Sequence, residues 1–406
     1  MKARIAAGLL FAVAAVSSTH AAAPGPSQVV GWRNDGTGRF PDAEPVTEWS
    51  KTSHVLWSAK VGSSASSPIA VEGKVLVTAE PDLLVCLDAG TGKERWRKAH
   101  GLSDLPPELN ARDLKLPALA GYTVPTPVSD GRRVYAWFGT GVAACYDLDG
   151  NRQWIRWLDV PQPTNYGRTA SPVLVGGKVI LHPGPLVCLD AATGKLLWQN
   201  EEAKAAYGTP AAARVGEVDI VITPRGDVVR VADGKTLTRD LGHTGYVSPV
   251  VQEGVVYFVD VEVVAVKLPE KIGDKFEAKE LWHEDLEGEF FASPVVSGGL
   301  VHTVDKDAVY YVLDAKTGKT VLKETLKLPP AGRESATILV YPSLALAGRH
   351  LFAANCAGDT MVLNPGRKLD EVRLNEMGQG SGGSFAFSGK RIFMRGGDLI
   401  YCVGVP

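Results

Sequence analysis

The sequence predicts an all-β fold, an eight-bladed β-propeller made of four-stranded antiparallel blades. Three observations predict this fold. A hairpin motif returns along the chain, a second motif precedes each copy, and the last unit lacks one strand that the N-terminal region can supply. Repeated units of this kind cannot bury their own apolar faces, so they stack on their neighbours.

The first motif is an apolar strand, an Asp-x-x-Thr-Gly turn and a second strand that carries Trp. Its clearest copies run from Leu84 to Trp96 and from Leu186 to Trp198, a third runs from Tyr311 to Lys319, and a shortened one from Cys145 to Trp154. Asp accepts hydrogen bonds from the backbone just after it, and Gly tolerates the positive φ that such a turn needs. Each copy is therefore expected to form a β-hairpin.

The second motif is Ser/Thr-Pro followed by an apolar strand, a Gly turn and another strand. Its prolines lie 38 to 59 residues apart. Its copies begin at Ser67, Thr126, Ser171, Thr209, Ser248, Ser293, the inverted pair Pro342-Ser343, and Gly383-Ser384. Pro can open a strand because its missing N–H is not needed there. The two motifs together give four short strands per unit.

The two ends of the chain complement each other. The last unit ends at Leu399 to Val403 without a fourth strand, whereas Val55 to Ala59 resembles an outer Trp-bearing strand without a hairpin before it. We expect the N-terminal strand to join the C-terminal blade, which closes the ring and removes exposed edges. Residues 54–406 are then the propeller and residues 24–53 an N-terminal lead-in.

Three regions depart from the repeat. The fourth unit keeps its turn but has no Trp, and the fifth replaces the Asp turn by a polar excursion that ends at Trp282. An insertion at residues 101–120 follows the first unit. Insertions in propellers form loops on one face and often bind partners.

Residues 1–23 have the pattern of a secretory signal peptide. Lys2 and Arg4 precede an apolar run from Ile5 to Val16, and an Ala-x-Ala site ends at Ala23. The run is shorter than a membrane-spanning helix requires. We expect a periplasmic or secreted protein with no membrane span in the mature chain. No Cys lies near the cleavage site, so a lipoprotein is not indicated.

Charge and cysteine usage narrow the partners. The formal net charge is −2 and no basic block is present, so nucleic acid is not an expected partner. Cys86, Cys145, Cys188 and Cys402 occupy one repeat position, which Val231, Ala265, Val312 and Val362 are expected to fill in the other units. Copies in separate blades lie too far apart for disulfides, so we expect free, buried thiols in a monomer.

Both motifs resemble the pyrroloquinoline quinone (PQQ)-like β-propeller repeat over nearly all of residues 54–406. That family includes PQQ-dependent alcohol dehydrogenases and BamB, the propeller subunit of the outer-membrane β-barrel assembly machinery. The resemblance implies that the outer-strand tryptophans dock one blade on the next. In this chain these would be Trp57, Trp96, Trp154, Trp198 and Trp282.

The resemblance leaves three functions open. A quinone dehydrogenase would need a calcium site, a catalytic Asp and a nearby Arg or Lys. The large dehydrogenases of the family also carry a vicinal disulfide, and this chain has no adjacent cysteines. Outside the hairpin turns, Asp305-Lys306-Asp307 comes nearest to a ligand spacing, and a solvated loop is the preferred interpretation.

We therefore expect no catalytic residues, no metal and no resident cofactor, and favour a non-catalytic scaffold for protein interaction or envelope assembly, with a protein partner in the cell envelope. A dehydrogenase using PQQ with calcium to oxidise an alcohol or sugar is one alternative. A module that binds a polysaccharide or a small molecule is the other.

Aromatic residues recur just before the Ser/Thr-Pro positions, where the chain crosses toward the central funnel, and polar residues accompany them. The candidates for contact with a ligand or partner are Tyr122, Asn165, Tyr166, Arg168, Tyr207, His243, Tyr246, Glu289, Phe291, Arg333 and Glu334, with Glu287 and Tyr341 beside them. These aromatics either form a recognition surface or plug the wide axial channel.

Overall fold

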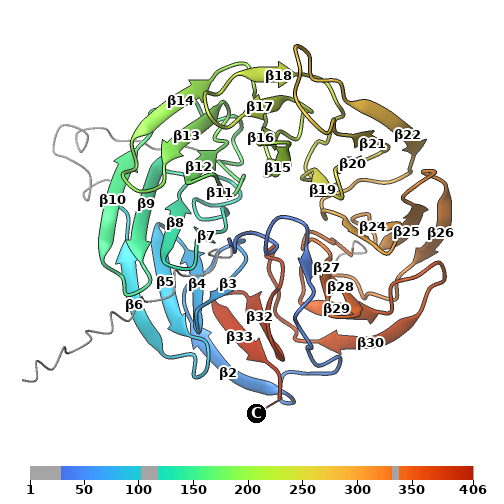
Figure 1. Cartoon of the computed structure of the whole chain (residues 1–406). Coiled ribbons are helices and arrows are strands. Elements are labelled where there is room, and N and C mark those ends of the chain that lie inside the picture. The colour runs from blue at the N-terminus through green and yellow to red at the C-terminus, as the bar shows by residue number, and fades with distance from the viewer. Residues whose placement is uncertain (1–28, 102–117, 332–337, 406) are drawn as a thin grey trace, which may run out of the picture.

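The computed structural model describes residues 29–101, 118–331 and 338–405. These residues form 33 strands arranged as a ring of eight blades, which confirms the predicted propeller (Figure 1). No helix long and apolar enough to cross a membrane occurs in the part of the chain that the structure describes. The predicted signal peptide and most of the 101–120 insertion lie outside the described residues.

The first four blades follow one another in the order of the chain. Blade 1 consists of β3 (Ile69–Val71), β4 (Lys74–Ala79), β5 (Leu83–Asp88) and β6 (Glu94–Ala99), and blade 2 of β7 (Val128–Ser129), β8 (Arg133–Trp137), β9 (Val142–Asp147) and β10 (Arg152–Trp157). Blade 3 consists of β11 (Val173–Val175), β12 (Lys178–Leu181), β13 (Leu186–Asp190) and β14 (Leu196–Asn200), and blade 4 of β15 (Ala211–Val215), β16 (Val218–Ile222), β17 (Val228–Arg230) and β18 (Thr236–Thr238).

The second half of the ring includes two strands from the N-terminal region. Blade 5 consists of β19 (Val250–Gln252), β20 (Val255–Val259), β21 (Glu262–Lys267) and β22 (Lys279–Asp285), and blade 6 of β23 (Val295–Ser297), β24 (Leu300–Val304), β25 (Val309–Asp314) and β26 (Thr320–Thr325). Blade 7 consists of β27 (Ala345–Ala347), β28 (His350–Ala354), β29 (Asp359–Leu363) and β30 (Glu371–Glu376), with β1 (Arg39–Phe40) added. Blade 8 consists of β31 (Ala386–Ser388), β32 (Arg391–Gly396) and β33 (Leu399–Val403), with β2 (Val55–Lys60) as its fourth strand.

The antiparallel order within each blade gives the disc two distinct faces. The chain enters each inner strand from one face, and the connection between the second and third strands lies on that face too. We call it the entry face; it carries, for example, Tyr207 and Tyr246. The Gly turns and the Asp-x-x-Thr-Gly turns, such as Asp88 to Gly92, lie on the opposite face, which we call the turn face.

The ring closes as predicted. β2 pairs with β33 in antiparallel register, with Trp57 opposite Cys402 and Lys60 opposite Leu399, so the N-terminal strand is the outer strand of blade 8 (Figure 1). Closure leaves each blade with a neighbour on both sides.

The Ser/Thr-Pro motif forms a closed ring of hydrogen bonds around the axis. In each blade the hydroxyl of the motif accepts the backbone N–H of the corresponding residue in the preceding blade, over 2.8 to 3.1 Å. The participants, in order, are Ser67, Thr126, Ser171, Thr209, Ser248, Ser293, Ser343 and Ser384. All eight are buried, so each bond satisfies a backbone donor that water does not reach. In the inverted pair Pro342-Ser343, Ser343 is therefore the residue that corresponds to the Ser or Thr of the motif in the other blades.

The five outer-strand tryptophans named from the sequence each lie on the next blade. Each indole N–H donates to a backbone carbonyl over 2.9 to 3.1 Å. The pairs are Trp57 with Ala89, Trp96 with Leu148, Trp154 with Ala191, Trp198 with Val231, and Trp282 with Ala315. Each ring also covers the glycine of that turn, so a Cβ on the glycine would lie within 2.8 Å of the indole.

The interface between blades 4 and 5 is filled by other means. Blade 4 has no outer Trp, and the excursion after β21 brings Phe276 and Ile272 into the cluster that joins blades 4 and 5. The lost indole is therefore replaced by apolar side chains from the following blade.

The N-terminal lead-in is part of the propeller, which the sequence did not predict. Val30 exchanges hydrogen bonds with Ser129 of blade 2, and β1 then pairs in parallel with β27, as a fifth strand of blade 7. Between these points Arg33 is buried in the channel, where it donates to the carbonyls of Pro294 (2.5 Å) and Leu344 (3.1 Å). The lead-in thus spans the axis.

Further along, the lead-in fills the interface between blades 7 and 8. Trp49 is 2% exposed and stacks on Phe352 at 6.2 Å, and its backbone N–H donates a hydrogen bond to the side-chain Oδ1 of Asn375 over 2.9 Å. Phe40 contacts Phe387 at 4.8 Å. These residues join a cluster shared by both blades.

The four repeat-position cysteines are buried and free, as predicted. One alignment was wrong. Arg230 occupies the place of the turn Asp, because its N–H bonds Lys235 as that of Asp88 bonds Lys93. Val228, not Val231, therefore fills the cysteine position of blade 4. The substitution of Asp by Arg hides this register from the sequence.

Candidate functional site

Five aromatic rings lie in succession on the entry face, one from each crossing into blades 3 to 7. Ring centroids are 6.2 Å apart for Tyr166 and Tyr207, 5.0 Å for Tyr207 and Tyr246, 4.9 Å for Tyr246 and Phe291, and 4.7 Å for Phe291 and Tyr341. We call these five residues the aromatic arc. Tilted and edge-to-face contacts of this kind stabilise one ring against the next.

The arc is open to solvent. Tyr166, Tyr246 and Tyr341 are 52%, 44% and 40% exposed, and Tyr207 and Phe291 are half-buried. Since the lead-in spans the channel, the exposure of the arc favours recognition over the alternative role of filling the axis. Large aromatic side chains that stay exposed to water on a folded protein are typical of contact surfaces.

Two predicted site residues lie elsewhere. The Arg168 guanidinium is buried and donates to the carbonyls of Gly139 and Val160, each over 2.6 Å, and it stacks over Trp137. Burial lowers the pKa of Arg168 to about 10. Arg168 is thus a structural residue. The backbone N–H of Tyr122 donates to Glu80 Oε1 over 2.8 Å, and the Tyr122 ring is half-buried outside the arc.

The remaining predicted polar residues are either exposed or lie outside the described residues. Asn165, His243 and Glu289 are exposed on the entry face. Glu287 is exposed and forms an ion pair with Lys323 over 2.5 Å, which lowers the pKa of Glu287. Arg333 and Glu334 lie outside the described residues.

Other functional groups near the arc come from the connections between second and third strands. The backbone N–H of Lys306 donates to the backbone carbonyl of Glu289 over 2.8 Å, and the carbonyl of Lys306 accepts the N–H of Val340. Burial raises the pKa of the Tyr341 hydroxyl, with further contributions from Cys356 and Glu289. The sequence offered one signal for these residues, because an antiparallel meander returns to the entry face at that connection.

Asp305 stands beside this group. Its Oδ1 accepts the backbone N–H of Asp307 over 2.9 Å and of Val309 over 2.8 Å. Burial raises its pKa despite these bonds. The Asp305-Lys306-Asp307 segment is therefore an ordered turn; it is a loop, as predicted, but only Asp307 is fully exposed and Asp305 is buried.

A cavity of about 320 Å³ lies in the channel between the lead-in and the inner strands of blades 2 to 5. Its walls are mainly aliphatic and proline side chains, with Trp32 and the single carboxylate of Asp35. Asp35 Oδ1 already accepts the N–H and hydroxyl of Thr37. Calcium prefers six to eight oxygen ligands, so this lining does not fit a quinone–calcium pair. Burial also lowers the pKa of Arg33 near this cavity to about 9.

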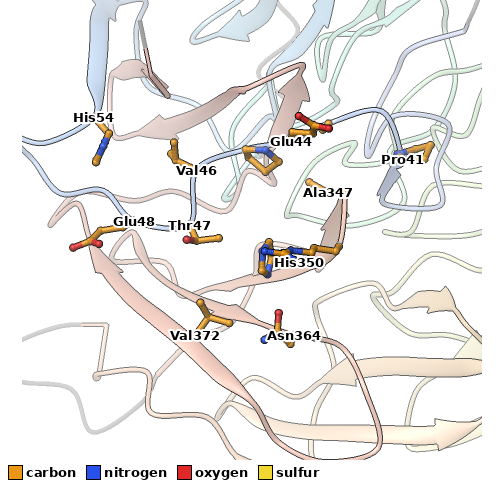
Figure 2. A pocket seen from close by; sticks show the side chains of 14 residues that line it. Pro41, Glu44, Val46, Thr47, Glu48, His54, Ala347, His350, Asn364 and Val372 are labelled. Carbon is orange, nitrogen blue, oxygen red and sulfur yellow. The ribbon is translucent and has the colours of Figure 1, made fainter.

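A second hollow, of about 950 Å³, lies between the lead-in and blade 7. Figure 2 shows Thr47 and Glu48 of the lead-in across from His350 and Asn364. Partial burial, with the nearby Arg349, lowers the pKa of His350. No group of three or more His, Cys, Asp or Glu side chains that could hold a metal occurs among residues 29–101, 118–331 and 338–405.

The similarity of this chain to known proteins agrees with its fold. The family model described as outer membrane protein assembly factor BamB matches residues 44–270 and 224–393. No curated protein matches the chain.

Three solved structures are similar in fold. BamB from Moraxella catarrhalis is 12% identical, with 86% of this chain and 97% of that chain covered and a TM-score of 0.61. The computationally designed protein Ika8 is 13% identical, covering 87% and 100% with a TM-score of 0.59. The C-terminal WD40 domain of Sif2 is 10% identical, covering 88% and 100% with a TM-score of 0.60. Such different proteins share the fold, so function must be argued from the surface.

Proposed function

The chain belongs to the family described as outer membrane protein assembly factor BamB, and we propose that it is an exported, non-catalytic scaffold that holds a protein partner in the cell envelope. In this proposal the partner binds the entry face, and the scaffold assists assembly of outer membrane proteins.

The observation that carries the proposal is the exposed aromatic arc. Large rings that are partly exposed on a rigid support lose little entropy on binding and dominate many protein interfaces. The other repeated residues already have structural partners: the Ser/Thr hydroxyls bond around the axis, and the indoles bond across blades. The arc is different, because the hydroxyls of Tyr166, Tyr207 and Tyr246 have no hydrogen-bond partner within the described residues and remain available.

The rigid ring also supports a scaffold. A propeller closed by β2 and held by buried hydrogen bonds fixes the arc residues, which come from five separate crossings, relative to one another. A surface fixed in this way binds without a large ordering cost.

Deletion of the gene tests this function. We expect the amount of folded β-barrel protein in the outer membrane to fall, and expression of the chain to restore it, with the protein recovered from the periplasmic fraction. Unchanged outer membrane proteins would contradict the proposal, as would dye reduction with an alcohol or sugar after addition of PQQ and calcium to the purified protein.

A further inference from the structure

Blade 5 carries an unbalanced negative charge. Residues 250–291 contain eleven acidic residues and four lysines, with no arginine, in a chain whose net charge is only −2. The excess is not spread evenly over the blade. It separates by face, and this separation matters because only the entry face carries the aromatic arc.

The turn-face end of blade 5 is close to balanced. There four lysines accompany five acidic residues, which are Lys267, Lys271, Lys275 and Lys279 with Glu253, Glu270, Asp274, Glu277 and Glu280. At the entry-face end the blade has six carboxylates and no cation of its own: Asp260, Glu262, Glu284, Asp285, Glu287 and Glu289. Only Glu287 forms an ion pair among the described residues, and its partner Lys323 belongs to blade 6. Glu262, Asp285 and Glu289 are exposed.

Two of these carboxylates, Asp260 and Glu289, lie beside the middle of the aromatic arc, and Asp260 Oδ2 accepts the N–H of Gly245 over 2.7 Å. Tyr246 is on the crossing that enters blade 5, Phe291 is on the crossing that leaves it, and their rings are 4.9 Å apart. Glu289 is two residues from Phe291 and affects the pKa of Tyr341 electrostatically. Val261, in the same end of the blade, is 46% exposed. Rings, an exposed aliphatic side chain and an excess of carboxylates therefore share one surface, with Lys306 of blade 6 near Glu289.

We propose that this surface docks an arginine-bearing, positively charged segment of the partner protein; the proposal rests on the function proposed above. A guanidinium can stack on an aromatic ring and donate two hydrogen bonds to a carboxylate, so it suits this combination better than an ammonium group does. The excess of carboxylates attracts such a segment over a distance that salt shortens. The rings then supply the apolar contact.

The test uses the full mature chain and a short fluorescent peptide of alternating arginine and leucine, with a twin in which glutamate replaces arginine. We expect the cationic peptide to bind at least about tenfold more tightly than its twin, and binding to weaken as salt is raised. Tyr246→Ala and Glu289→Lys should each weaken binding about tenfold, a loss of about 1.4 kcal/mol.

Glu277→Lys is the matched control, because it makes the same charge change at an exposed position on the turn face of the same blade. It should alter affinity by less than about twofold. Equal binding of both peptides would overturn the proposal, and so would an equal loss from Glu277→Lys and Glu289→Lys. Binding of a soluble oligosaccharide at the arc, with neither peptide bound, would overturn it in favour of glycan recognition.

The same variants separate this proposal from the function it rests on. If Glu289→Lys and Tyr246→Ala restore outer membrane proteins in the deletion strain as well as the unaltered chain does, the docking surface is wrong and the scaffold stands. If the cationic peptide binds the arc but deletion changes no outer membrane protein, the scaffold role is wrong and the surface stands.

Discussion

At the scale of single residues, the repeat is explained by pairs of residues in neighbouring blades. The glycine of each Asp-x-x-Thr-Gly turn has two separate reasons to be glycine. Gly194 has a φ of 69°, and a Cβ there would lie 2.6 Å from the Trp154 ring. The sequence predicted the first reason from the turn, but the second depends on a contact between blades that spacing alone does not reveal.

Replacing two glycines should separate these reasons. Gly73→Ala, at a φ of 68° with no atom within 4 Å of the new Cβ, should cost about 1 kcal/mol through backbone strain. Gly194→Ala should cost about 3 kcal/mol, because the methyl group must also displace the Trp154 indole. Urea unfolding of the two variants measures the difference. Equal losses would show that the indole does not press on the turn.

A buried histidine gives a pH dependence. His182 is 2% exposed, its Nε2 lies 3.0 Å from the carbonyl oxygen of Ala203, and burial lowers its pKa to about 4. The unfolded chain, with an ordinary histidine pKa of about 6.5, binds the proton more readily. Stability should therefore be full above pH about 6.5 and fall as the pH drops toward 4, by up to about 3 kcal/mol for this group.

His182→Gln should lessen that decline, since glutamine can still donate to Ala203 and does not titrate in this range, whereas the buried His302, whose pKa is also lowered to about 4, still contributes. The measurement is the urea midpoint at several pH values for both proteins. Parallel curves for the variant and the unaltered chain would show that His182 does not contribute to the acid sensitivity.

The candidate site was only partly predictable at this scale. The aromatic positions follow from the motif, because each arc residue shortly precedes a residue of the hydrogen-bonded ring. Arg168 comes from the same crossing as Tyr166, yet its side chain is buried against Trp137. Sequence spacing places both on one crossing but does not determine which side chain faces water. The charge separation in blade 5 likewise became visible only when the two faces were known.

At the scale of elements, the lead-in is the segment that the sequence described least well. It has neither helical nor strand periodicity, so it was predicted as a region outside the propeller. The contacts that hold it to the propeller are with distant residues: Arg33 with Leu344, Trp49 with Asn375, and Phe40 with Phe387. Local pattern cannot reveal an element that is ordered by contacts of this kind.

Trp49→Ala should therefore destabilise the protein by about 3 to 5 kcal/mol, as expected for removal of a buried aromatic side chain. The neighbouring Glu48→Ala removes an exposed ion pair with Arg373 and should cost less than about 1 kcal/mol. Chemical denaturation of both variants checks this. If Trp49→Ala lowered stability no more than Glu48→Ala, the lead-in would not hold blades 7 and 8 together.

At the scale of the whole molecule, the ring, its eight blades and its closure were predictable because they follow from repetition. The copies fix the strand number, and the missing fourth strand of the last unit fixes the pairing of β2 with β33. The fifth strand of blade 7 and the obstruction of the channel were not predictable, since both arise outside the repeat. The lead-in crosses the axis of the ring. The aromatic arc lies on the entry face alone, so the two faces differ.

The central claim is that the partner binds the entry face. A photoreactive phenylalanine analogue placed at Tyr246, and in a second variant at Lys316 in an exposed turn-face loop, tests it most directly in living cells. We expect a discrete crosslinked protein from position 246, which disappears when Glu289→Lys is added, and none from position 316. Crosslinks from position 316 alone, or identical products from both positions, would contradict the account.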